Sequence, residues 1–128
     1  MIKQKMFSAG EGKYKITLMA TITEEGLVVQ IYGGEKPHLG AIALSTPRPS
    51  LADPEQISCT TIVIPLPGHK DDQVAKPVAE EIAKAWGSQV LAVVGIHVDN
   101  AGDKDIEKLT DNCHKVKNAL LEGLCGMI

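Results

Sequence analysis

Aromatic side chains are scarce in this sequence and make up only 3% of its 128 residues. The four aromatic residues are Phe7, Tyr14, Tyr32 and Trp86. A core with so few rings must be built from Val, Ile, Leu and Ala. Proteins that bind single-stranded nucleic acids stack bases on aromatic rings and surround them with basic side chains. Because this chain has few rings and a net charge of −3, we expect no nucleic-acid partner.

Paired cysteines and long apolar runs are also missing. Cys59, Cys113 and Cys125 are widely spaced and form no CxxC pair. An odd number of cysteines at such spacing is typical of a reducing compartment. No stretch approaches the roughly 18 consecutive apolar residues of a transmembrane helix, and residues 1–10 lack the apolar run of a signal peptide. We therefore expect a cytoplasmic protein with no membrane partner.

Two glycine-containing segments lack the patterns that bind nucleotide phosphates. Gly33 and Gly34 belong to no GxGxxG, and no helix is predicted after them, so the dinucleotide-binding fingerprint is excluded. Gly68, followed by His69 and Lys70, lacks the flanking glycine and the Ser or Thr of a Walker loop. A nucleotide-binding enzyme of either common type is therefore not indicated.

Alternation of apolar and polar residues predicts strands in the first half of the chain. Every second residue from Ile16 to Ile22 is apolar, which is the period of a strand. Glu24–Gly26 is a predicted turn, in which the glycine supplies a positive φ and joins two strands as a hairpin. Thr46–Pro54 contains three prolines and is a predicted surface loop. The predicted strands are Lys13–Thr23, Leu27–Tyr32, Leu39–Ser45 and Ser58–Leu66.

The apolar period then changes to that of a helix. A first helix is predicted from about Asp72 to Gly87, where the glycine ends it. The almost wholly apolar run Val90–Val98 predicts a strand buried on both faces. Asp103 is the predicted N-cap of a last helix. The apolar stripes are Val74, Val78, Ile82 and Trp86 in the first helix, and Ile106, Leu109, Cys113, Val116 and Leu120 in the second.

Four strands, a helix, a strand and a helix predict a single α+β domain over residues 1–128. Consecutive strands favour antiparallel pairing, and the fifth strand enters through a helical crossover. We expect a five-stranded, mostly antiparallel sheet with both helices on one face. Thr17, Thr21, Gln30 and Tyr32 would cover the other face only in part, which predicts a homodimer.

Three segments place a glycine and a histidine at or near the boundary of a predicted strand. One hypothesis is that His38, His69 and His97 converge and, with Asp99, hold a divalent metal or contact an anion, as in a small metal-dependent hydrolase. The other is that they are unrelated loop histidines, because the spacing contains no HxH or HExxH. The segments are Gly33–Gly40, Gly68–Asp72 and Gly95–Asn100.

The start of the first predicted helix allows two interpretations. A helix N-terminus offers free N–H groups and a positive dipole, and Lys70 beside it adds a positive charge, so an anion could bind there. Asp71 and Asp72 would repel a phosphate, however, and acidic residues at this position also serve as ordinary caps. The sequence leaves both interpretations open.

Taken in order, the three segments resemble the LpdD-like family of prenylated-flavin chaperones. The shared features are GG-x-x-PH-[hydrophobic]-G ending at Gly40, HKD opening a helix, and GIHV after a buried strand. Members are small proteins encoded beside UbiD-type decarboxylases, such as the accessory subunit of gallate decarboxylase. The resemblance covers about Tyr14 to Leu121 and extends, in expected fold, to small eukaryotic proteasome-assembly chaperones.

The resemblance implies a protein that catalyses no reaction itself. It implies binding of prenylated FMN, a flavin mononucleotide with an extra prenyl-derived ring, and its delivery to a UbiD-type decarboxylase, with a flavin prenyltransferase as a further partner. Tyr32 is the best candidate for stacking on the flavin ring. A protein-only assembly chaperone is the remaining alternative. The cofactor-binding residues that this resemblance indicates are Gly34, His38, His69, Lys70, Asp71, Asp72, His97, Asp99 and Asn100.

Overall fold

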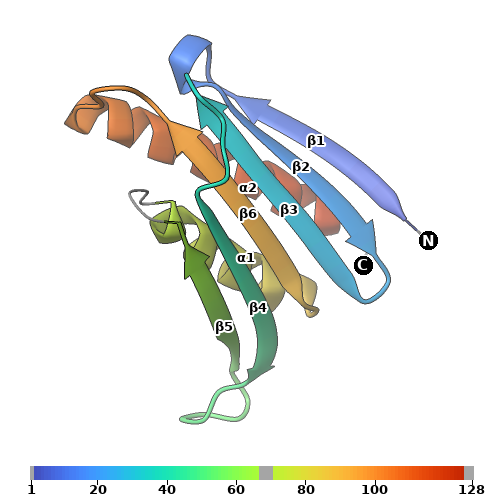
Figure 1. Cartoon of the computed structure of the whole chain (residues 1–128). Helices are drawn as coiled ribbons and strands as arrows, with labels where there is room; N and C mark the ends of the chain where they lie inside the picture. The colour runs from blue at the N-terminus through green and yellow to red at the C-terminus, as the bar shows by residue number, and fades with distance from the viewer. Residues whose placement is uncertain (1, 67–70, 126–128) are drawn as a thin grey trace.

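A computed structural model describes residues 2–66 and 71–125 of the chain. Within these residues, six strands form one mixed sheet, and two α-helices pack behind it in the view of Figure 1. The elements are β1 (Lys3–Ala9), the short 3-10 helix η1 (Gly12–Tyr14), β2 (Ile16–Thr23), β3 (Gly26–Gly34), β4 (Ala41–Pro49), β5 (Ile57–Pro65), α1 (Asp72–Trp86), β6 (Val90–His97) and α2 (Asp103–Cys125).

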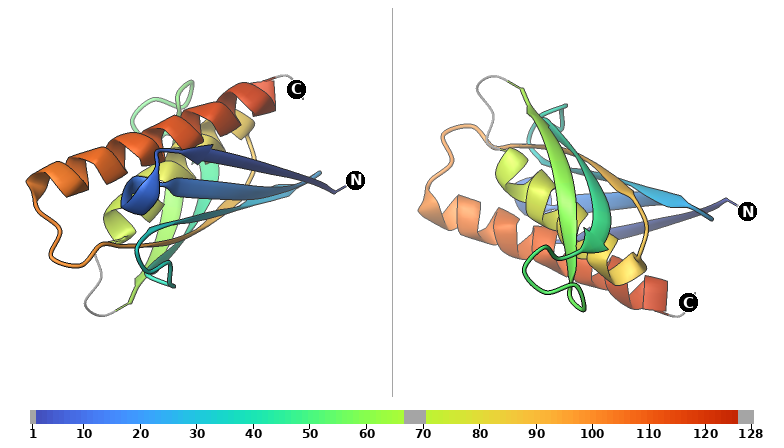
Figure 2. Two further views of the ribbon diagram at one scale, coloured as in Figure 1. Left: turned by 90° about the horizontal axis from the view of Figure 1, so that it is seen from above. Right: turned by 90° about the horizontal axis from the view of Figure 1, so that it is seen from below.

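The strands lie in the order β1-β2-β3-β6-β4-β5. β6 is inserted between β3 and β4, parallel to β3 and antiparallel to β4, and the other neighbouring pairs are antiparallel. α1, which connects β5 to β6, packs on β4, β5 and β6, whereas α2 packs on β1 and β2. Figure 2 shows the two helices side by side on the same face of the twisted sheet.

The core lies between this face and the helices, and it is aliphatic as the composition predicts. Ile16, Leu18 and Ile22 of β2 are completely buried, as are Val90 and Val94 of β6. Each such side chain stabilises the fold by about 1.5–3 kcal/mol on burial. Alternate residues of the same strands point to the opposite face, which carries no helix among the described residues.

The predicted α+β class and the placement of both helices on one face are confirmed, but the number of strands was underestimated. The additional strand is β1, which pairs with β2 from Lys3↔Ile22 to Ala9↔Ile16. Its inward-facing residues are Lys5, Phe7 and Ala9, all half-buried. Because this face of β1 includes a lysine and has no fully buried residue, the alternation of apolar and polar residues in its sequence is too weak to predict a strand.

The predicted loop Thr46–Pro54 was partly wrong, because β4 continues to Pro49. The pairing of β4 with β6 ends at Ser45, and beyond that point β4 pairs only with β5. Proline lacks an N–H and is tolerated where a strand has one open edge. Pro47 and Pro49 therefore occupy the part of β4 where a missing donor costs little.

The predicted limits of α1 are confirmed. Gly87 adopts a left-handed conformation with φ 79° and donates its N–H to the carbonyl of Ala83. The predicted cap of α2 was wrong by one residue. Asp103 is the first helical residue, whereas the carbonyl of Gly102 accepts the N–H of Ile106. Neither helix is both long and apolar enough to cross a membrane, as far as the described residues go.

Candidate functional site

Two of the glycine–histidine segments meet at one end of the sheet. β3 and β6 run in parallel, so Gly34 and His97, their last residues, are direct neighbours. The segment that follows β3 then folds across the end of β6, where the Gly40 N–H donates to the carbonyl of Val94 at 2.9 Å. The start of α1 lies at the same end, which brings Asp71 into contact with both segments.

Three glycines are required for this close approach. A Cβ on Gly95 would lie 1.3 Å from the carbonyl oxygen of His38, and one on Gly40 would lie 1.8 Å from Oδ2 of Asp71. At Gly34, φ is +80° and a Cβ would lie 2.3 Å from the carbonyl oxygen of His97. These glycines therefore let the histidine segments and the helix start pack against one another.

The first histidine–carboxylate pair joins His38 to Asp71. Nε2 of His38 lies 3.3 Å from Oδ2 of Asp71, whose side chain is only 8% exposed. The other carboxylate oxygen of Asp71 accepts the N–H of Ile96 at 3.2 Å. Nδ1 of His38 lies 2.9 Å from the carbonyl oxygen of Lys36. Both ring nitrogens of His38 therefore face oxygen acceptors, which orients the ring.

The second pair joins His97 to Asp99 and is open to solvent. Nε2 of His97 lies 2.8 Å from Oδ1 of Asp99, whose side chain is 51% exposed. Lys36 approaches the same carboxylate at 3.5 Å, and Glu35 accepts the N–H of Asp99 at 3.1 Å. The hydrogen bond with His97 and then the charge of Lys36 hold the pKa of Asp99 below its ordinary value. The rings of His38 and His97 meet edge to face, with centroids 6.0 Å apart.

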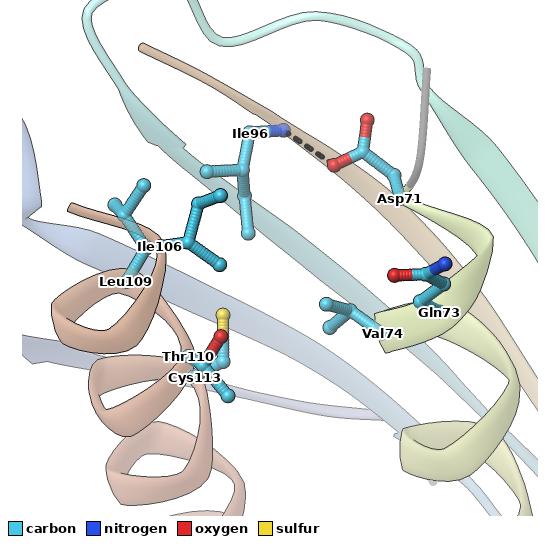
Figure 3. Close-up of a pocket in the computed structure, with 8 residues that line it drawn as sticks. All are labelled: Asp71, Gln73, Val74, Ile96, Ile106, Leu109, Thr110 and Cys113. Carbon is cyan, nitrogen blue, oxygen red and sulfur yellow. Dashed lines mark hydrogen bonds between the residues drawn. The ribbon is translucent and has the colours of Figure 1, made fainter. Parts of the chain in front are cut away.

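Two hollows adjoin these pairs. The larger has a volume of about 430 Å³ and opens between the start of α1 and the first half of α2 (Figure 3). The smaller, about 310 Å³, is lined by Lys36, His38, Leu39 and His97. Asp71 lines the larger hollow and contacts His38 of the smaller one. The other residues of the larger hollow are Gln73, Val74, Ile96, Ile106, Leu109, Thr110 and Cys113.

The thiol of Cys113, in the wall of the larger hollow, is unreactive. Burial, and secondarily the charge of Asp71, raises the pKa of Cys113 to about 12. The thiol is therefore protonated at neutral pH and acts as an apolar group in the wall. This agrees with the position of Cys113 on the apolar stripe predicted for the last helix.

The structure brings together five of the residues that the sequence singled out: Gly34, His38, Asp71, His97 and Asp99. The segment with His69 and Lys70 lies outside the described residues, so a third histidine at this site stays a prediction. Within residues 2–66 and 71–125, no group of three His, Cys, Asp or Glu side chains could hold a metal ion.

The remaining candidates lie apart from the two hollows. Asp72 is the half-buried first residue of α1, and Asn100 is exposed in the turn after β6 with a left-handed φ of 54°. Tyr32 lies on the sheet face away from the helices, where its hydroxyl donates to Gln30 at 3.1 Å. None of these three side chains lines either hollow.

Sequence reasoning missed Lys36 and the apolar wall of the larger hollow. Lys36 lies inside the first glycine–histidine segment, so its position could have been noticed. Val74, Ile106 and Leu109 belong to the apolar stripes of the two helices, and such stripes ordinarily predict core packing. The structure shows that at this end these three side chains line the larger hollow between the two helices (Figure 3).

A family model described as the prenylated flavin chaperone LpdD-like domain matches residues 10–125. No curated protein matches the chain at a significant level. The chain is also similar to a crystal structure of a novel chaperone complex for yeast 20S proteasome assembly. The TM-score is 0.56, the identity is 16%, and 96% of each chain is covered. At this identity the likeness shows a shared fold alone, and that fold agrees with the one expected from the sequence.

Proposed function

Because this chain belongs to the family of prenylated flavin chaperone LpdD-like domains, we propose that it binds prenylated FMN and delivers it to a UbiD-type decarboxylase. In this proposal the chain is an accessory protein that holds the cofactor and performs no chemistry on it. One observation supports the proposal. Asp71 lines the mostly apolar larger hollow and contacts His38 of the smaller hollow, whose other lining residues include Lys36 and His97. We call Lys36, His38 and His97 the basic rim.

The larger hollow fits the ring system of such a flavin. Its volume of about 430 Å³ falls within the roughly 300–1,000 Å³ of small-molecule sites. Its walls are mostly aliphatic, with Ile96 from β6, Val74 from α1 and Ile106 from α2. An extended, largely apolar ring gains from leaving water for such a surface.

The smaller hollow fits the phosphate group. Lys36 supplies a cationic ammonium group, and the rings of His38 and His97 line the hollow beside it. Asp71 lies beside the His38 ring and Asp99 lies beside the His97 ring, so the two carboxylates orient the imidazoles. A flavin mononucleotide that spans both hollows would lie across Asp71.

The first test is an anaerobic titration of the purified protein with prenylated FMN, followed by absorbance and fluorescence, with FMN titrated for comparison. Ile106→Glu places a charge in the exposed part of the apolar wall, and we expect the Kd to rise at least about tenfold, a loss of about 1.4 kcal/mol. Ile57→Glu, at the first residue of β5, is the matched control, because Ile57 is 56% exposed and Ile106 is 53% exposed; it lines neither hollow and should leave the Kd unchanged.

The second variant, His97→Ala, tests the basic rim. We expect weaker binding of prenylated FMN and a smaller effect on a flavin that lacks the phosphate. Unchanged affinity in both Ile106→Glu and His97→Ala would contradict the proposed site. A wild-type chain that binds no flavin but holds the decarboxylase would instead favour a protein-only chaperone, and native mass spectrometry of the same samples would reveal a bound metal.

A further inference from the structure

The two edges of the sheet differ in how well they are protected from other chains. β1 and β5 are the border strands, and each pairs with one neighbour among the described residues (Figure 1). Proteins commonly block such edges with lysines, prolines or bulges, because an open edge offers free backbone groups. β1 carries Lys3 and Lys5 within seven residues. β5 has nine residues, no charged side chain, and a proline only at its end, so it is the less protected edge.

The hydrogen bonds between β4 and β5 show which backbone groups of β5 face this edge. At the two ends of the ladder, the N–H of Ser50 donates to the carbonyl of Gln56 at 2.8 Å, and the N–H of Leu66 donates to that of Gly40 at 3.0 Å. In an antiparallel pair, residues bonded to the neighbour alternate with residues whose backbone groups point away. The even-numbered residues of β5 are therefore bonded to β4. The outward N–H groups belong to Ile57, Cys59, Thr61 and Val63.

The composition of β5 suits the addition of another strand. Six of its nine residues are β-branched, and such side chains favour the extended conformation. An extended peptide can add to an open edge through main-chain hydrogen bonds, while its alternate side chains provide specificity. The outward groups of β5 therefore match an extended segment of another protein.

The side of α1 next to β5 adds a preference for charge. The carboxylate of Glu80 accepts the hydroxyl of Thr61 at 2.8 Å, and its carbonyl accepts the thiol of Cys59 at 3.6 Å. Lys76 and Lys84 stand four residues before and after Glu80 and share its side of the helix. Both lysines are exposed, and neither forms an ion pair with another described residue. Acidic side chains of an added segment would lie beside these lysines.

β5 also leads to the proposed cofactor site. The N–H of Leu66, directly after β5, bonds to the carbonyl of Gly40. Gly40 packs against Asp71, which lines the larger hollow and contacts His38 of the smaller one. A protein docked along β5 would therefore reach the end of the sheet where both hollows open. A protein that receives the flavin needs this proximity.

From these observations we propose that β5 is the docking strand for the UbiD-type decarboxylase, whose identity as partner rests on the proposed function. The enzyme contributes an extended segment that pairs with the outward backbone groups of β5. Its side chains toward α1 include at least one Asp or Glu, which Lys76 and Lys84 attract. Its side chains on the other face are uncharged, because those of β5 on that face are Ser58, Thr60, Ile62 and Ile64.

Amide hydrogen exchange of the full chain, read by NMR, tests the backbone pairing. The chain is measured alone and with an equimolar, flavin-free UbiD-type decarboxylase. We expect the amides of Cys59, Thr61 and Val63 to exchange at least about tenfold more slowly with the enzyme, because they gain acceptors. The amides of Thr60 and Ile62, which donate to β4 in both states, are the internal control and should change less.

A charge reversal beside the edge tests the choice of partner. Lys76→Glu should raise the Kd for the decarboxylase about fivefold, because an attraction becomes a repulsion at an exposed position. Lys115→Glu is the matched control, since Lys115 is also exposed and lies on α2, which packs on β1 and β2. Neither lysine lines the two hollows, so both variants should keep the wild-type affinity for flavin.

Four results would overturn the docking strand. The outward amides could already exchange slowly in the dilute free chain, or become slow when only the concentration of the chain is raised, which would assign the edge to a second copy. The enzyme could bind without slowing these amides, which would leave the proposed function intact with another docking surface. A complete lack of binding to the enzyme would contradict both the docking strand and the delivery, whereas the flavin titration tests the cofactor site separately.

Discussion

The two histidine–carboxylate pairs lie at the same end of the sheet but in very different surroundings. Asp71 is buried, accepts the N–H of Ile96 and is approached by His38. Asp99 is half exposed in a turn and is shared between His97 and Lys36. Asp71 thus connects the start of α1 to β6 and to the segment after β3. Asp99 connects only neighbouring groups on the surface.

This difference suggests a division of roles. A buried carboxylate that loses its partners pays the full cost of desolvation, so the groups around Asp71 are held in one arrangement. An exposed ion pair is weak because water and salt compete with it. In the proposed function, Lys36 and His97 would therefore exchange Asp99 for the phosphate, while the buried pair of His38 and Asp71 holds the end of the sheet in place.

The largest expected effect comes from Gly95→Ala, which disrupts the buried pair through the backbone. The added methyl group would lie 1.3 Å from the carbonyl oxygen of His38, so the segment that carries His38 must move away from β6. We expect either no folded protein or a loss of at least about 3 kcal/mol in urea-induced unfolding. Gly26→Ala is the control, because its methyl group would have only ordinary contacts at 3.7 Å, and it should cost less than about 1 kcal/mol. Equal losses in the two variants would show that the segment is not tightly packed.

The next largest effect is the difference in stability between variants that lack one or the other carboxylate. Asp71→Ala leaves the Ile96 N–H and the His38 ring without this acceptor in a buried place, and we expect a loss of about 2–4 kcal/mol. Asp99→Ala removes an exposed partner, and we expect a loss of less than about 1 kcal/mol. Urea unfolding of both variants at neutral pH measures the difference. Losses of similar size would contradict the division of roles drawn from burial.

Local patterns were sufficient to predict most of the framework. The alternation from Ile16 to Ile22 predicted β2, the continuous apolar run predicted the buried β6, and the spacing of four predicted α1 up to Gly87. Each of these signals depends on residues that are close in the sequence. The predicted positive φ of Gly26 was wrong, because Gly26 is the first residue of β3 and is not among the glycines with positive φ.

Which residues meet at the site is decided by contacts between segments that are far apart in the sequence, and local sequence patterns do not reveal such contacts. His38 meets Asp71 because β6 is inserted between β3 and β4, which places the end of β6 beside the segment after β3. Nothing near either residue in the sequence records this insertion. Gly40 and Gly95 lie in the glycine–histidine segments that the sequence singled out, but only the structure shows that their neighbours are Asp71 and His38. The spacing of glycines and histidines therefore indicated candidate site residues, but it did not predict which of them are in contact.

The smallest expected effect is a change in the pKa of Asp99, and it tests which partner matters more in the exposed pair. Its pKa is lower in the folded protein than the ordinary value of 3.8, chiefly through the hydrogen bond with His97 and next through the charge of Lys36. The ionised carboxylate therefore stabilises the fold above the unfolded value, and this contribution is lost as the pH falls through the folded value. We expect His97→Ala to raise the pKa of Asp99 toward 3.8, and Lys36→Met to raise it less.

Carbon-13 NMR titration of the Asp99 carboxyl group measures both changes. Asp105 provides an internal control, because its own lowered pKa depends first on the hydrogen bond from Tyr14 and should be the same in all three proteins. A larger shift in Lys36→Met than in His97→Ala would mean that the lysine, and not the imidazole, is the main partner of Asp99. In that case a bound anion would have to displace Asp99 mainly from Lys36, and His97 would be the more available group.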